Sequence, residues 1–109
     1  NLNRQEGDHW YSSARMAQLA GNGILVFTHA APRFDELMPE RSLVYFQDQD
    51  DPLHRVRDFH HDDDRRREWA GRARDFFHRE MNSRLYARFI VESALGLPLS
   101  HDYVWRSRP

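Results

Sequence analysis

Cysteine is absent from the 109-residue sequence. That excludes disulfide bonds, thiolate zinc sites and cysteine catalysis, and it is typical of a cytoplasmic protein. No apolar run approaches the roughly 18 residues that a membrane-spanning helix requires, and no signal peptide is recognisable. Lysine is absent as well, so that all 16 basic residues are arginine. A compositional bias of the genome is the simpler explanation, although arginine also suits bidentate recognition of phosphate or carboxylate.

Common catalytic, nucleotide-binding and metal-binding sequence motifs are missing too. The sequence contains no GxSxG, P-loop or GxGxxG motif and no HExxH ligand set. The His60-His61 pair runs into three aspartates, but neighbouring residues do not share a helix face, so we expect a solvated helix boundary and no metal site. The net charge of −1 and the mixed signs of "DDDRRRE" (62–68) argue against binding to nucleic acid or to an anionic membrane.

The apolar pattern alternates between strand-like and helix-like periods. Strands are predicted over 24–28 and 42–46, with a frayed strand over 1–5 and helices over 13–20 and 32–38 between them. Three helices follow, beginning near Pro52, Asp62 and Asn82. This order predicts one α/β domain over residues 1–109, a Rossmann-like three-layer unit with a short parallel sheet of about three strands and C-terminal helices.

The same pattern predicts what each element buries. The run "ILVFT" (24–28) has no polar interruption before its last residue, so we expect that strand to be buried on both faces. The tail after Ser100 is rich in aromatic residues and is expected to dock on the domain. The expected apolar sides of the three C-terminal helices are Leu53, Val56 and Phe59; Trp69, Ala73, Phe76 and Phe77; and Leu85, Phe89, Ile90 and Leu95.

The helix over 13–20 offers the clearest candidate for a ligand site. Ligands of open parallel sheets bind beyond the carboxyl ends of the strands, where helix N-termini also point. Free N–H groups in the first turn would favour a phosphate, a guanidinium there can add a charge-assisted hydrogen bond, and an amide one turn later can bind a ribose hydroxyl. The next strand would end on the same crevice. The candidate residues are Ser13, Ala14, Arg15, Gln18, Thr28 and His29.

A purely structural interpretation of this helix remains open. In that interpretation Ser12 or Ser13 serves simply as the N-cap of the helix. Arg15 then pairs with Asp8, and Gln18 is solvated.

The segment "SSARMAQLAGNGILVFT", followed by Glu36-Leu37 and the strand "LVYF", resembles the C-terminal domain of GT-B-fold glycosyltransferases. The group that it resembles is the glycosyl transferase group 1-like group, with spore-maturation-protein relatives, and the resemblance covers residues 1–95. It implies that the N–H groups at Ser13–Arg15 face the donor diphosphate and that Gln18 holds the ribose. The more widespread pattern has glutamate at Gln18 and again eight residues earlier, where this chain has Trp10.

The resemblance implies the nucleotide-sugar-binding part of a glycosyltransferase that uses an NDP-sugar donor and requires no metal or cofactor. The acceptor-binding N-terminal domain would lie outside the sequence, which begins at Asn1 without a methionine. We therefore expect an excised fragment that is inactive alone and can dimerise through an exposed sheet edge. The missing acids at Trp10 and Gln18 favour an alternative, a non-catalytic α/β interaction module derived from that fold.

Overall fold

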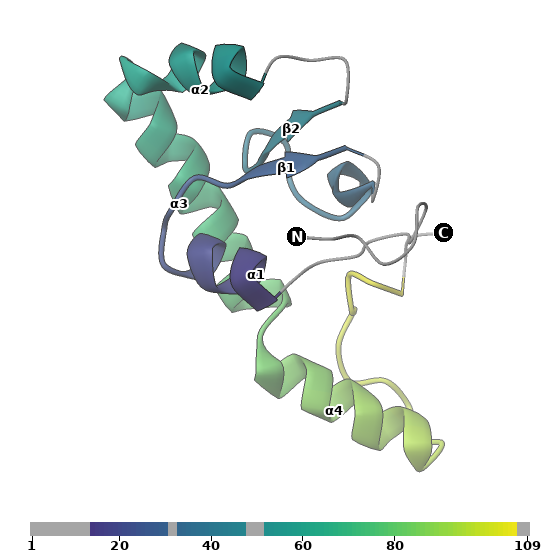
Figure 1. Cartoon of the computed structure of the whole chain (residues 1–109). Helices are drawn as coiled ribbons and strands as arrows, with labels where there is room; N and C mark the ends of the chain where they lie inside the picture. The colour runs from purple at the N-terminus through teal and green to yellow at the C-terminus, as the bar shows by residue number, and fades with distance from the viewer. Residues whose placement is uncertain (1–13, 31–32, 48–51, 107–109) are drawn as a thin grey trace.

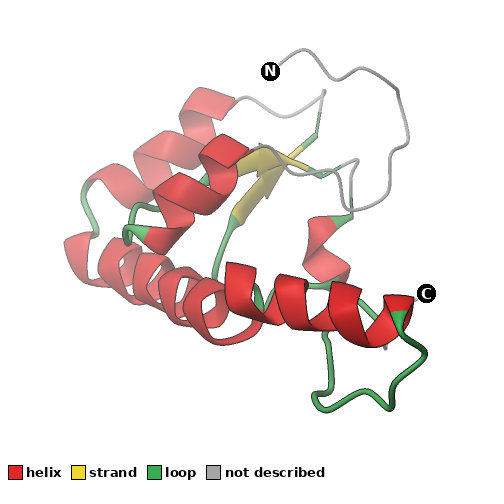
Figure 2. Cartoon of the chain, turned by 90° about the horizontal axis from the view of Figure 1, so that it is seen from below, coloured by secondary structure: helices red, strands yellow, loops and turns green. Residues whose placement is uncertain are grey.

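The computed structural model describes residues 14–30, 33–47 and 52–106. The elements in chain order are α1 (Ala14–Gly21), β1 (Phe27–His29), the 3-10 helix η1 (Phe34–Glu36), β2 (Val44–Phe46), α2 (Pro52–His60), α3 (Asp63–Glu80) and α4 (Ser83–Ala94). The two short strands lie among the helices (Figure 2), and α4 extends away from the sheet at the lower end of α3 (Figure 1). The predicted α/β class with C-terminal helices is confirmed.

The two strands form a parallel sheet in which Phe27 pairs with Val44 and His29 with Phe46. The 3-10 helix lies in the connection between them, and α1 runs antiparallel to β1 (Figure 1). The parallel arrangement was predicted. The described part of the chain contains two strands, whereas about three were expected, and the strand predicted over residues 1–5 lies outside the described residues.

The predicted strand over 24–28 is wrong in its start and in its burial. The amide of Ile24 donates to the carbonyl of Leu19 (3.0 Å), so Ile24 completes the end of α1 and its side chain stays 50% exposed. Pairing begins only where the amide of Val44 donates to the carbonyl of Val26 (3.0 Å). The strand proper, Phe27–His29, is half-buried along its whole length, whereas burial on both faces was expected.

The helix predicted over 32–38 is shorter than expected. It is a single 3-10 turn in which the amides of Leu37 and Met38 both donate to the carbonyl of Phe34. Arg33 precedes this turn in the left-handed region, with φ 56°, and Pro39 follows it. Residues 31 and 32 lie outside the described residues.

One face of the sheet packs against α1, η1 and the second half of α3. Buried side chains from all of these elements form a single core, and three of them, Ala73, Phe76 and Phe77, confirm most of the apolar stripe predicted for α3. The buried members of this core are Met16, Ala20, Val26, Phe34, Leu37, Met38, Leu43, Ala73, Phe76 and Phe77.

The opposite face of the sheet contacts α2 and the start of α3 through aromatic rings. Phe27 meets Phe59 edge to face at 5.9 Å, and Phe59 meets Trp69 at 5.0 Å. The guanidinium of Arg65 lies 4.2 Å from the ring centre of Phe59, a cation–π contact. Phe59 is therefore buried as predicted, but Leu53 and Val56 are exposed, because no described element covers that side of α2.

The aromatic tail docks on α4, as predicted. The ring of Trp105 stacks on Tyr86 at 4.5 Å, and Tyr103 packs against Phe89 at 5.1 Å and is buried. The apolar face predicted for the last helix is only partly right. Leu85 is buried, but Ile90 is exposed, as is Leu95 beyond the end of α4, because the tail covers a different side of the helix.

Two carboxylates hold this tail in place. Glu92, which is buried in α4, accepts hydrogen bonds from the hydroxyl of Tyr103 (2.8 Å) and from both the amide (3.2 Å) and the hydroxyl of Ser100. The bonds from Ser100, with help from Tyr103, lower the pKa of Glu92 even though desolvation acts in the opposite direction. Glu80 at the end of α3 lies 3.2 Å from Nε2 of His101.

Replacing Phe77 tests the core. Phe77→Ala removes a buried ring from the α3 side of the core and should lower the free energy of unfolding by about 3–5 kcal/mol. The matched control Leu95→Ala truncates an exposed side chain and should change stability by less than about 0.5 kcal/mol. Chemical denaturation measures both values. Equal effects of the two substitutions would contradict the assignment of the core.

Replacing Glu92 tests the anchor of the tail. Because its pKa is lower in the folded chain, its contribution to stability is present above the ordinary pKa of glutamate, about 4.3, and is lost as the pH falls through the lowered value. Thermal melts of Glu92→Gln should therefore give a lower Tm than the wild type at pH 7, with a gap that closes as the pH falls through the lowered pKa of Glu92. The exposed Glu68, paired with Arg72, provides the control Glu68→Gln, for which we expect little change. A gap that persists at low pH would rule out the carboxylate as the cause.

Candidate functional site

Helix α1 places two of the predicted site residues on one exposed face. Met16 and Ala20, four residues apart, point into the core against α3. Arg15 and Gln18, three residues apart, are therefore directed to solvent together, and Ala14 is exposed beside them. Ser13, the predicted first residue of the site, lies outside the described residues.

The far end of α1 is held by a Schellman-type turn. The amide of Ile24 donates to the carbonyl of Leu19 and that of Gly23 to the carbonyl of Ala20, each at 3.0 Å, while Gly23 takes φ 77°. Nδ2 of Asn22 also donates to the carbonyl of Gln18 (2.7 Å). This confirms that the Gly-Asn-Gly sequence ends the helix.

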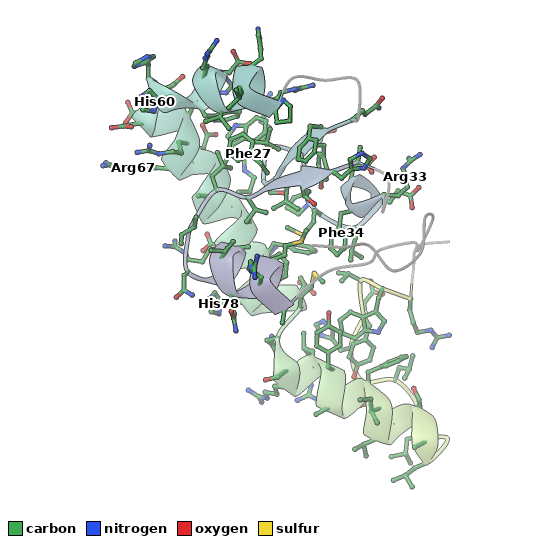
Figure 3. All side chains as sticks on the ribbon, in the orientation of Figure 1. Phe27, Arg33, Phe34, His60, Arg67 and His78 are labelled. Atoms are coloured by element: carbon green, nitrogen blue, oxygen red, sulfur yellow. The ribbon has the colours of Figure 1, made fainter. Side chains whose placement is uncertain are left out.

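A long-range hydrogen bond then ties this end to α3. Nε2 of His78 lies 2.8 Å from the carbonyl of Gly21, and since a carbonyl can only accept, the proton of that bond sits on Nε2. His78 projects from the second half of α3 beside α1 (Figure 3). The axis of α1 is thus fixed by its buried side and by its C-terminus, which leaves its N-terminus aimed at the far edge of the sheet.

The other two predicted residues, Thr28 and His29, end β1 at that same edge. Because α1 is antiparallel to β1, the N-terminus of α1 and the carboxyl end of β1 share one side of the molecule (Figure 1). Both residues are half-buried, and the ring of His29 meets Phe46 edge to face at 5.6 Å. The amide of Ala30 continues the ladder by donating to the carbonyl of Phe46 (2.9 Å). The first turn of α1 and the last residues of β1 thus lie toward the same side of the molecule.

Two further side chains at this edge were not predicted. Arg33 follows β1 and pairs with Asp35 (3.3 Å) and Glu36 (3.2 Å). The position of Arg33, a few residues after the end of a predicted parallel strand, is the sequence signal that could have identified it. The two residues of the Glu36-Leu37 pair have different environments. Glu36 forms an ion pair with Arg33, and Leu37 is buried in the core.

Tyr45 is the second. It pairs with Thr28 across the sheet, and its buried hydroxyl has no hydrogen-bond partner among the described residues. Desolvation, with the charge of Asp35, raises its pKa, so the hydroxyl stays protonated and is available as a donor at neutral pH. The side chain packs against the core, where an unsatisfied hydroxyl is costly.

The opposite edge of the sheet has a different character. A hollow of about 400 Å³ lies at the amino end of β1, between Gly23–Phe27, α2 and the first half of α3.

Within the described ranges no three His, Asp or Glu side chains gather as a metal site requires. No helix among the described residues is long and apolar enough to cross a membrane.

The model of a family described as glycosyl transferase-like matches residues 1–92, which include every residue of the candidate site. No curated protein and no solved structure matches the chain. Since the match extends over most of the sequence and agrees with the α/β fold, the chain belongs to the glycosyl transferase-like family.

Proposed function

We propose that this chain forms the nucleotide-sugar-binding part of a glycosyltransferase, which transfers a sugar from an NDP-sugar donor to an acceptor bound elsewhere. The observation that supports this most directly is the common exposed face of Arg15 and Gln18, on a helix whose N-terminus lies at the carboxyl edge of a parallel sheet. Family membership supports glycosyl transfer as the class of reaction, and the exposed first turn of α1 supports the choice of this helix as the donor site.

In this proposal each group has a separate task. The N–H groups at Ala14 and Arg15, together with Ser13, receive the diphosphate, whose negative charge the helix dipole and the Arg15 guanidinium stabilise. Gln18, one turn along, binds ribose hydroxyls through its amide. Thr28 and His29 border the sugar from the end of β1. The reaction requires no metal or cofactor in this scheme.

In this proposal a separate domain binds the acceptor, and the residues of this chain bind the donor without transferring the sugar by themselves. The edges of a two-stranded sheet also leave backbone groups for pairing with a second copy, and a homodimer formed in this way is part of the proposal.

The chemistry of position 18 supports an alternative, a non-catalytic α/β interaction module. Gln18 lacks the charge of the glutamate that is more widespread there, and an amide is a weaker acceptor for hydroxyls than a carboxylate is. A chain that has lost donor binding would keep the fold, because the polar side of α1 contributes nothing to the core.

Titration with UDP-glucose, GDP-mannose and dTDP-glucose separates the two functions. Isothermal titration calorimetry should detect binding of at least one donor by the wild type, and Arg15→Ala should weaken it by about tenfold, as expected for a lost charge-assisted hydrogen bond. Arg84→Ala, on the distant α4, is the matched control and should leave the affinity unchanged. If no donor binds, the interaction module is the better description.

The substitution Gln18→Glu gives a second, opposite prediction. A carboxylate one turn into α1 should strengthen the hydrogen bonds to the ribose and raise donor affinity by about three- to tenfold. Ala17→Glu adds the same charge one residue away, where the side chain points in a different direction around the helix, and it should give no gain. A gain from both substitutions, or from neither, would contradict the assignment of Gln18 to the ribose.

A further inference from the structure

The hollow at the amino end of β1 is separate from the proposed donor site and differs from it in chemistry. It is bordered by the end of α1, by α2 and by α3, and its volume of about 400 Å³ falls within the usual range for small-molecule sites. The proposed donor site, at the N-terminus of α1, lies toward the carboxyl end of β1, whereas the hollow lies at its amino end.

The floor of the hollow is apolar. Phe27 points from β1 toward α2, where Phe59 meets it (Figure 3). Ile24 and Val56 complete this floor, and they keep 50% and 44% of their surfaces exposed although both line the hollow. Exposed aliphatic side chains that line a concave surface are typical of a site for an apolar group.

The rim, in contrast, is cationic. Arg66 and Arg67 line the hollow from the first turns of α3, and His60 lines it from the end of α2. The guanidinium of Arg66 is paired with Asp63 at 2.8 Å. Arg67 forms no ion pair with any described residue and projects outward from α3 (Figure 3). A planar cation beside an apolar floor fits a ligand that has both an oxyanion and a hydrocarbon body.

We propose that this hollow binds an amphipathic anion, an alkyl chain that ends in a phosphate or a carboxylate. The chain lies over Phe27, Ile24 and Val56, and the oxyanion accepts hydrogen bonds from Arg67. A nucleotide is a poorer match, because the floor has no polar side chain to pair with a base or a ribose. The site is independent of donor binding and does not rest on the proposed function.

Calorimetric titration of the chain with decyl phosphate tests the site, with decanoate, decanol and inorganic phosphate as the other arms and every amphiphile kept below its micelle concentration. Decyl phosphate, decanoate or both should bind at least tenfold more tightly than either decanol or inorganic phosphate. The stronger of the two identifies the head group. Equal binding of decanol would reduce the hollow to an apolar surface, and equal binding of inorganic phosphate would reduce it to a cationic one. Either result overturns the proposal.

Matched variants locate the binding. Val56→Asp puts a charge on the floor and should weaken binding by more than tenfold, while Arg67→Ala should weaken it by about tenfold for the anions and leave decanol unchanged. The control Val91→Asp places the same charge on the exposed apolar side of α4. All three residues are exposed, so the fold should persist, as circular dichroism can verify. Loss of binding in Val91→Asp but not in Val56→Asp would assign the ligand to α4 and refute the proposal.

Discussion

The packing of α1 against α3 fixes the position of the candidate site. Met16 and Ala20 are buried against the α3 stripe, and His78 of α3 holds the carbonyl of Gly21 at the end of α1. Once that side and that end are fixed, Arg15 and Gln18 must face solvent at the carboxyl edge of the sheet. The site is thus built on a rigid helix whose polar side has no structural duty, a combination that leaves its side chains available for a ligand.

Local signals predicted much of the fold. The Gly-Asn-Gly turn, the helix start near Pro52 and the 3.6-residue stripe of Ala73, Phe76 and Phe77 each depend on a few neighbouring residues, and each was confirmed. The predictions that failed concerned burial. The run over 24–28 was expected to be enclosed on both faces, and Leu53, Val56, Ile90 and Leu95 were expected to be covered, but apolar periodicity states which side can be buried and not whether a partner surface exists.

For the candidate site, a sequence rule suggests some of the residues, while other features depend on the packed structure. The rule that ligands bind at the carboxyl ends of parallel strands is the basis for proposing Arg15, Gln18, Thr28 and His29 as site residues, and their role stays a prediction. The same rule cannot find Tyr45, whose significance comes from a hydroxyl left without a partner in the packed structure. Nor can it find the hollow at the opposite edge, since that depends on the angle at which α2 meets α3.

The central claim is that a nucleotide binds at the carboxyl edge, over the exposed face of α1. Two-dimensional NMR of the ¹⁵N-labelled chain, recorded during addition of UDP, GDP or dTDP, tests it residue by residue. The claim predicts shifts of the amides of Ala14, Arg15 and Gln18 together with those of Thr28 and His29, and none around the hollow lined by Phe59 and Ala70. Shifts that gather around that hollow, or no shift with any of the three nucleotides, would contradict it.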